Sequence, residues 1–233
     1  MYEEKIIPPK KAMPQAQDGT LRKFALRVPE VIYQCSGIMV FGKRIKSLVF
    51  STDLSIIKNV NADAIIAVYP FTPQPIITQA LLLAADIPVF AGVGGGLTKG
   101  QRVVNLAMFA EMQGATGVVV NAPTPGRILN RIRSSVDVPV VVTVANSDTN
   151  YRHRIEDGAA ILNVAAGAQT PEIVAEIRER FPDYPIIATG GPTDESILET
   201  IQAGANAITW TPPTNGEIFR DIMAAYRDNK PHP

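Results

Sequence analysis

Short apolar runs alternate with longer stretches of helical periodicity along most of the chain. From residue 46 onward, the apolar runs lie at 47–51, 64–69, 87–92, 117–121, 138–145, 160–165, 185–189 and 206–211. Helical spacing of apolar residues follows them near 53–60, 73–85, 98–113, 125–134, 149–157, 170–181, 193–203 and 216–228. Strands and helices that alternate in this way form parallel sheets with right-handed crossovers. Eight such units predict a TIM (β/α)8 barrel over residues 46–233, because a flavodoxin-like open sheet usually has five strands.

Residues 1–45 do not follow this pattern and predict an N-terminal extension. Residues 1–24 mix prolines with charges, which indicates an extended arm. Val31–Gln34 and Ile38–Phe41 flank Cys35-Ser36-Gly37, a sequence compatible with a small hairpin. Such a hairpin either plugs one end of the core or pairs with a partner chain, and the sequence leaves both alternatives open.

A repeat gives the register of the strands. Gly114-Ala115, Gly158-Ala159 and Gly204-Ala205 each precede an even-numbered strand, so the barrel is expected to consist of four strand pairs. Successive strand residues face opposite sides. In the even-numbered strands, every second residue is apolar. Trp210 belongs to this apolar set and is expected to pack against the last helix. The residues between them include all the polar side chains, and we expect this set to face the barrel interior. Its polar members lie near the rim where barrel enzymes bind ligands, and they are Asn121, Asn163, Thr209 and Thr211. Thr143 and Thr189 occupy matching positions in the odd-numbered strands.

Several of these residues are candidates for ligand binding. Asn121 and Asn163 stand in strands, where asparagine is rare and costly unless it forms hydrogen bonds, so we expect ligand contact, with a structural hydrogen bond as the alternative. Asn146 is a further rim candidate. Gly190-Gly191 follows a strand, and the loops after the last two strands of such barrels commonly bind phosphate through free backbone N–H groups.

Three charged residues are candidates for catalysis. Asp53 is placed to act as a general base at the rim, but it also stands where a helix N-cap belongs. Asp148 has the same two interpretations. Lys99 ends a glycine-rich segment, Gly92–Lys99, which is either a strand-to-helix loop with Thr98 as the helix cap or a mobile lid whose lysine meets an anionic ligand.

Composition narrows the class of protein. Lys+Arg and Asp+Glu both number 22, so nothing indicates binding to nucleic acid or to a membrane. One cysteine and two distant histidines argue against a zinc cluster, and no cofactor is expected, although Asp53 with amide and carbonyl oxygens is a possible Mg²⁺ site. The longest apolar run is too short to span a bilayer and the N-terminus does not look like a secretion signal, so we expect a cytoplasmic protein.

The stretch from 160 to 208 resembles a known superfamily. Ala160-Ile-Leu-Asn-Val-Ala-Ala-Gly, Pro171-Glu-Ile-Val-Ala-Glu-Ile, Pro185-Ile-Ile-Ala-Thr-Gly-Gly and Ala203-Gly-Ala-Asn-Ala-Ile resemble the ribulose-phosphate-binding barrels. The layout is similar to keto-deoxy-phosphogluconate aldolases and glycerol-uptake-operon antiterminator-like barrels. The resemblance implies phosphate binding by Gly167, Gly190, Gly191 and the loop after Thr209–Thr211. Strand 6 lacks the Schiff-base lysine of those aldolases, and Pro212-Pro213 departs from the glycine-rich relatives.

Three functional hypotheses follow. The first is an isomerase or lyase acting on a small phosphorylated metabolite, with Asp53 or Asp148 as acid or base and Lys99 as an electrophilic or phosphate-binding group. The second is a non-catalytic, ligand-sensing regulatory barrel, which the shortage of titratable groups at the rim favours. The third is a metal-assisted hydrolase that uses Mg²⁺. Barrels of this kind commonly associate through helix faces, so a homo-oligomer is expected.

Overall fold

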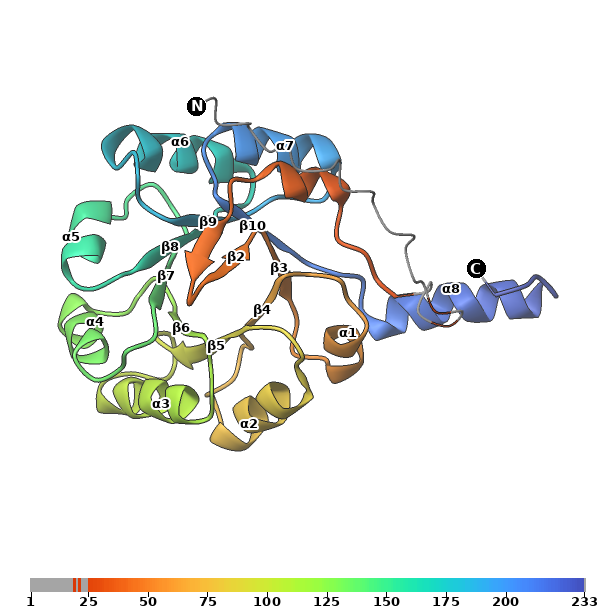
Figure 1. The fold of residues 1–233 in the computed structure, drawn as a ribbon, viewed down its shortest axis with the longest axis horizontal. Helices are drawn as coiled ribbons and strands as arrows, with labels where there is room; N and C mark the ends of the chain where they lie inside the picture. The colour runs from red at the N-terminus through yellow and green to blue at the C-terminus, as the bar shows by residue number, and fades with distance from the viewer. Residues whose placement is uncertain (1–18, 20, 22–24, 233) are drawn as a thin grey trace, which may run out of the picture.

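A computed structural model describes residues 25–232 together with Gly19 and Leu21, so most of the predicted extended arm lies outside the described residues. The predicted TIM barrel is confirmed: eight parallel strands close into a ring in the order β10-β3-β4-β5-β6-β7-β8-β9 (Figure 1). The strands are β3 (Ser47–Phe50), β4 (Ala64–Ala67), β5 (Val89–Gly94), β6 (Gly117–Val120), β7 (Val140–Val144), β8 (Ile161–Val164), β9 (Ile186–Thr189) and β10 (Ala207–Trp210). Each lies within the predicted apolar run or within two residues of it.

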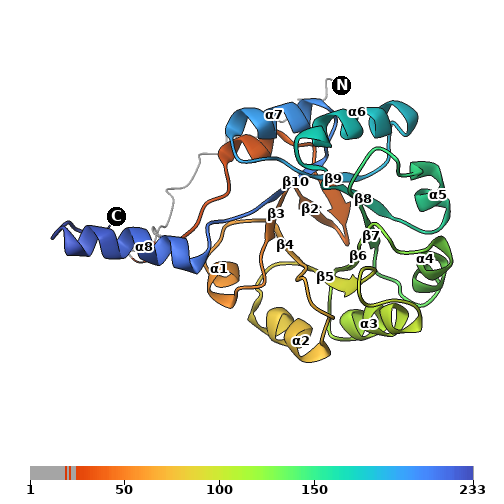
Figure 2. The ribbon, with the colours of Figure 1, turned by 180° about the vertical axis from the view of Figure 1, so that it is seen from behind.

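A helix follows each strand. Those that surround the barrel are α1 (Leu54–Lys58), α2 (Pro75–Ala84), α3 (Gln101–Met112), α4 (Gly126–Arg133), α5 (Tyr151–Glu156), α6 (Thr170–Arg180) and α7 (Asp194–Gln202). The last helix, α8 (Asn215–Arg227), instead projects away from the ring, as the view from behind also shows (Figure 2). No helix among the described residues is long and apolar enough to cross a membrane.

The predicted register of the strands is confirmed by two separate layers of buried side chains. Leu48, Phe90 and Val119 belong to a cluster inside the barrel. Val118, Leu162 and Ile208, which have the opposite parity, belong to the layer between the strands and the helices. Because the two layers never exchange parity along a strand, the polar members of the inward parity must face the lumen.

The Gly-Ala repeat is the end of a helix followed by the start of a strand. Gly114, Gly158 and Gly204 all have positive φ, at +98°, +115° and +113°. The amide of the following alanine donates to the carbonyl five residues back, for example Ala115 N to Ala110 O at 2.9 Å. This is the Schellman arrangement, for which glycine is the favoured residue. The repeat therefore records a backbone requirement that recurs before even-numbered strands.

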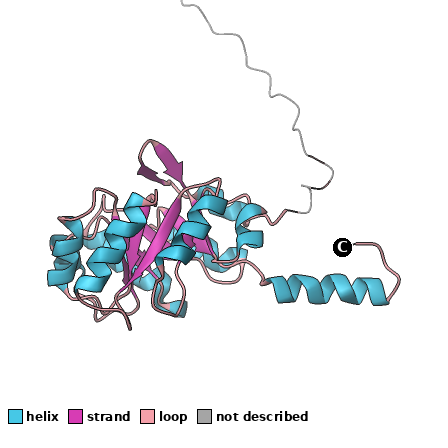
Figure 3. Ribbon diagram, turned by 90° about the horizontal axis from the view of Figure 1, so that it is seen from below, coloured by secondary structure: helices cyan, strands magenta, loops and turns pink. Residues whose placement is uncertain are grey.

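The N-terminal hairpin differs from the prediction. Val31–Gln34 belongs to a 3₁₀ helix, η2 (Glu30–Gln34), and the hairpin instead pairs β1 (Ile38–Val40) with β2 (Lys43–Ile45). Phe41 and Gly42 both have positive φ, as a two-residue hairpin turn of the primed type requires. Ile38, Val40 and Ile45 pack into the inner cluster, so the hairpin plugs one end of the barrel (Figure 3).

The N-terminal segment covers a sector that a barrel usually leaves to its eighth helix. Leu26 bridges to Val60 after α1, and η2 lies against α7 (Figure 1). Val28, Ile32 and Cys35 are at most 2% exposed and join the outer layer of the core. Burial raises the pKa of the Cys35 thiol to about 12. Trp210 is partly buried and packs on the outer layer of the core, as Ile218 in the first turn of α8 also does, and its direct contact with this helix stays a prediction. The rest of α8 leaves the barrel, and the helix contains no buried residue.

Candidate functional site

Four predicted ligand contacts converge inside the mouth of the barrel. Thr143, Asn163, Thr189 and Thr209 stand on the neighbouring strands β7, β8, β9 and β10, with Thr143 opposite Asn163 and Thr189 opposite Thr209. All four have the inward parity. Asn163 and Thr209 are only 7% and 6% exposed. The arrangement forms a half-ring of neutral hydrogen-bonding groups at the carboxyl ends of the strands, where barrel enzymes bind their ligands.

Two atoms of this half-ring have no hydrogen-bond partner among the described residues. They are Oδ1 of Asn163 and Oγ1 of Thr209. Asn163 makes only a long contact, from Nδ2 to Thr143 Oγ1 at 3.5 Å. A buried polar atom without a partner costs about 1–3 kcal/mol, so such atoms usually meet a ligand or an ordered water.

The facing side of the mouth contains a cavity of about 180 Å³. Its floor is formed by Val68, Gly92, Val119 and Asn121, and its walls by the loops after β4 and β5. At roughly 30 Å³ per water molecule, the space equals about six waters, which suits a metabolite of a few carbon atoms. The predicted contact residue Asn121 therefore does reach the mouth.

Sequence reasoning missed Thr98, which lines the same cavity. Thr98 is 5% exposed, and its Oγ1 has no partner among the described residues. The predicted capping role is wrong, because the N-cap of α3 is Gly100, without a side-chain bond. The glycine loop around Thr98 was visible in the sequence, but its path back into the mouth depends on the positive φ of Gly94 and Gly95.

The predicted phosphate loops are only partly brought together. Gly167, Thr189, Gly190 and Gly191 line one pocket of about 420 Å³ between α6 and α7. The N–H groups of Gly190 and Gly191 donate to no other described residue, as an anion site requires. Glu199 lines the same pocket, however, and its carboxylate opposes an anion there.

The other two members of the predicted phosphate set lie elsewhere. Thr209 faces the lumen and Thr211 is exposed after the end of β10, and neither lines the pocket between α6 and α7. Gly190 also has a packing role, since a Cβ there would lie 2.8 Å from Ile197 and from Ile208. Its presence after β9 is therefore explained by packing alone.

Asp53 is the N-cap of α1. Its Oδ1 accepts from the amides of Ser55 at 2.8 Å and Ile56 at 3.3 Å, and Oδ2 accepts from Asn215 Nδ2 at 2.5 Å. The hydroxyl of Ser55 and these further donors hold the pKa of Asp53 below its usual range. A carboxylate fixed in this way is a weak base, so the capping interpretation accounts for Asp53 without catalysis.

Replacement of Asp53 by alanine is expected to lower stability by about 0.5–2 kcal/mol, the usual cost of losing an N-cap. Because folding lowers the pKa of Asp53, its contribution to stability is complete above the ordinary aspartate pKa of 3.8 and declines as pH falls through the lower pKa of the folded state. Chemical denaturation of wild type and Asp53→Ala from pH 7 to pH 2 measures the difference. A gap between the two that widens below pH 4 would contradict this account.

Lys99, Asn146 and Asp148 do not join the mouth. All three side chains are exposed. Asn146 and Asp148 line a surface hollow of about 540 Å³ that shares no residue with the mouth cavity. The capping role predicted for Asp148 is wrong, because Asn150 caps α5 by accepting from the amide of His153 at 3.1 Å.

A Mg²⁺ site does not fit the side chains of the mouth. Mg²⁺ in proteins is held by carboxylates together with other oxygen ligands. The half-ring supplies hydroxyls and an amide, and the carboxylate of Asp53 is occupied by Ser55, Ile56 and Asn215. Within residues 25–232, no group of three or more His, Cys, Asp or Glu side chains lies close enough to hold a metal ion.

Comparison with known proteins shows the fold. No family model and no curated protein matches the chain. Solved structures that superpose on it include phosphonopyruvate hydrolase in complex with oxalate and Mg²⁺ (TM-score 0.60, 13% identity, 80% of this chain and 84% of that one). Oxaloacetate acetylhydrolase with its product oxalate has a TM-score of 0.60 at 10% identity, over 85% of this chain and 84% of that one.

A third similar structure is phosphoenolpyruvate phosphomutase from Streptomyces platensis subsp. rosaceus, with a TM-score of 0.59 and 15% identity over 79% of this chain and 83% of that one. The aldolase and antiterminator barrels named above are not among these three. At such identities a superposition establishes architecture alone. The chain thus has the (β/α)8 barrel fold that these enzymes of phosphorylated and carboxylate metabolites also have.

Proposed function

We propose that the protein binds a small metabolite with a carboxylate or phosphate group in the mouth of the barrel. The observation that carries this proposal is the pair of buried, unpartnered atoms of Asn163 and Thr209, at the end of the barrel where ligands bind. If the Asn163 amide is turned over, Oδ1 accepts from the Thr143 hydroxyl and the NH₂ group points to the ligand. Thr189 and Thr209 add hydroxyl donors for the same oxyanion.

We further propose that the chemistry is of the lyase or isomerase type, with the anionic group of the metabolite at Asn163 and Thr209 and the rest of it in the facing cavity of about 180 Å³ beside Asn121. The phosphomutase among the similar barrels supports this class, and the two hydrolases with oxalate in their structures support a small carboxylate as the ligand. Lys99, in the loop that forms the cavity wall, is the candidate to meet the anion when the loop closes. A cytoplasmic location remains part of this proposal.

A second function, ligand sensing without catalysis, is favoured by one observation. The described residues of inward parity at the mouth include Thr143, Asn163, Thr189 and Thr209 but no Asp, Glu, His or Lys. General acid–base catalysis would therefore need a group from outside the mouth. The two functions share the binding site and differ in turnover.

Replacement of Thr209 by valine separates binding from stability. The hydroxyl has no partner in the ligand-free protein, so Thr209→Val is expected to raise the melting temperature slightly and to weaken ligand binding about tenfold or more. Calorimetric titration with oxalate and with inorganic phosphate measures affinity. Thr170→Val is the matched control, since Thr170 is 1% exposed and its hydroxyl accepts from Ala166 N at 3.1 Å. It should lose stability and keep its affinity.

Two outcomes decide the proposal. Equal affinity of wild type and Thr209→Val for both anions, or no binding of either, would overturn the site. If oxalate or phosphate binds as expected, incubation with phosphonopyruvate, phosphoenolpyruvate and oxaloacetate tests catalysis. Conversion of any of these without hydrolysis supports the lyase or isomerase, hydrolysis contradicts that class, and binding without consumption supports the sensor.

A further inference from the structure

Thr98 carries a buried hydroxyl group that its own chain does not use. Thr98 is 5% exposed and lines the cavity of about 180 Å³ that faces the half-ring. Its Oγ1 has no hydrogen-bond partner among the described residues, and it does not cap α3, whose N-cap is Gly100. A buried hydroxyl without a partner costs about 1–3 kcal/mol, and valine has the same shape without that cost. The hydroxyl of Thr98 therefore requires a partner from outside the chain.

Asn121 lines the same cavity, and its main chain is fixed while its side chain is not. Its amide N–H donates to Gly94 O at 3.0 Å, and its carbonyl accepts from Thr124 Oγ1 at 2.9 Å. Its side-chain amide bonds to no other described residue. The next residue of the loop, Gly95, donates from its amide to Thr98 O at 3.0 Å. Two adjacent glycines thus hold Thr98 and Asn121 at one cavity, although the two residues are far apart in sequence.

The rest of the cavity lining is uncharged and mostly apolar. It consists of Val68, Tyr69, Pro70, Phe71, Pro73, Gly92, Gly94, Gly96, Leu97 and Val119. The phenol oxygen of Tyr69 is already engaged, since it accepts from Gln74 N at 2.6 Å. Phe71 and Leu97 are 73% and 84% exposed, so the walls offer apolar surface that a bound carbon chain would cover. Thr98 and Asn121 are therefore the polar groups that this cavity offers to a ligand.

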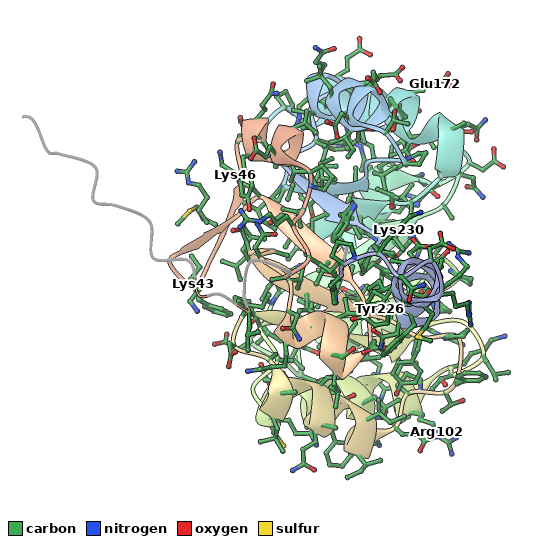
Figure 4. All side chains as sticks on the ribbon, turned by 90° about the vertical axis from the view of Figure 1, so that its right-hand side faces the viewer. Lys43, Lys46, Arg102, Glu172, Tyr226 and Lys230 are labelled. Carbon is green, nitrogen blue, oxygen red and sulfur yellow. The ribbon has the colours of Figure 1, made fainter. Side chains whose placement is uncertain are left out.

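The cations that follow Thr98 in the sequence do not line the cavity. Lys99 and Arg102 are both exposed, and Figure 4 shows Arg102 at the outer edge of the molecule. An anionic group placed in the cavity would lose its water without gaining an opposite charge, which is strongly unfavourable. The end of a ligand that enters this cavity is therefore expected to be uncharged.

We propose that the metabolite has a single anionic group and, at its other end, a hydroxyl group bound by Thr98 Oγ1 and the side-chain amide of Asn121. This inference rests on the proposed binding of the anionic group at Asn163 and Thr209. A hydroxyl both donates and accepts hydrogen bonds, and so do the threonine hydroxyl and the asparagine amide. The apolar walls cover the carbon chain between the two polar ends. The substrate class is a hydroxylated monocarboxylate or monophosphate of a few carbon atoms.

Calorimetric titration of the full chain with two series of probes tests this class. The carboxylate series is butyrate, its 2-, 3- and 4-hydroxy derivatives and succinate, and the phosphate series is propyl phosphate and glycerol phosphate. At least one hydroxylated probe should bind about tenfold or more tightly than its unsubstituted parent, because a site built for a hydroxyl rejects the analogue that lacks it. Succinate, which brings a second charge, should bind more weakly than that hydroxybutyrate.

Two variants at one position assign the preference to Thr98. Thr98→Val keeps the shape of the side chain and should abolish the preference for the hydroxylated probe, with the affinity for the unsubstituted parent within about twofold of wild type. Thr98→Ser keeps the hydroxyl and should keep the preference. Neither variant should lower the melting temperature by much, because Oγ1 of Thr98 makes no bond within the described protein.

The outcomes distinguish this inference from the proposed function. If butyrate or propyl phosphate binds but a hydroxyl adds less than about twofold, the hydroxyl site is overturned and the anion site stands. The same follows if Thr98→Val keeps the preference. Tighter binding of succinate than of every hydroxybutyrate overturns the uncharged character of the cavity. If no member of either series binds to wild type, the proposed function fails and this inference fails with it.

Discussion

Replacing Arg178 with methionine is expected to destabilise the protein by about 1.5–3 kcal/mol, the usual net contribution of hydrogen bonds made by a charged group. The guanidinium of Arg178 donates to the carbonyls of Gly204 at 2.8 Å, Pro182 at 2.5 Å and Tyr184 at 2.9 Å, and to Asn206 Oδ1 at 2.7 Å. These acceptors belong to the end of α6, the entry to β9 and the turn before β10. Burial lowers the pKa of Arg178, but an arginine stays charged in the working range of pH.

Methionine fills a similar volume and supplies no donors, so the carbonyls lose their partners while packing is nearly kept. Arg180→Met is the matched control two residues later, because Arg180 is exposed and makes only an ion pair with Glu176 at i,i+4. An exposed ion pair at this spacing contributes about 0.3–0.5 kcal/mol to the free energy of unfolding. Urea unfolding of the two variants measures the contrast. Similar losses in both would mean that the network around Arg178 contributes no more than a surface ion pair.

The sequence predicted the barrel well because its signals are local and repeated. The period-two alternation and the Gly-Ala repeat fixed the register that brings Thr143, Asn163, Thr189 and Thr209 together inside the mouth. A helix that ends in a Schellman motif needs glycine wherever it occurs, so the same dipeptide recurs. The inward parity then follows from strand geometry alone.

The sequence was ambiguous or misleading where the outcome depends on distant partners. Asp53 was equally compatible with catalysis and capping, and the residue that holds its second oxygen, Asn215, lies 162 positions away. The apolar face of α8 has the same spacing whether a helix covers its own barrel or another one. The segment with Val28 and Ile32 is buried against the barrel, whereas α8 has no buried residue, and no local pattern in the sequence indicates this difference. The position of Thr98 in the wall of the mouth cavity likewise depends on how the glycine-rich loop folds back over the mouth.

Replacing Gly95 with alanine is expected to cost about 3–5 kcal/mol, because positive-φ strain and overpacking combine. Gly95 has φ of +102°, and a Cβ there would lie 2.0 Å from Thr124 Oγ1 and 2.9 Å from the amide nitrogen of Asn121. That amide is already fixed by its bond to Gly94 O at 3.0 Å. Relief of the clash must therefore move the loop after β5 away from the loop after β6, at the wall of the mouth cavity.

Gly96→Ala is the control within the same loop. Gly96 does not have positive φ, and the nearest atom to a Cβ is Asn121 Nδ2 at 3.6 Å, an ordinary contact. Its stability should change by less than about 0.5 kcal/mol. Adding Thr124→Ala to Gly95→Ala should restore part of the loss, since it removes the closest clashing atom. Urea unfolding and oxalate titration of the three variants test both consequences. If Gly95→Ala were as stable as Gly96→Ala, the two loops would not approach each other in solution, and the cavity beside Asn121 would be wider than the proposed ligand requires.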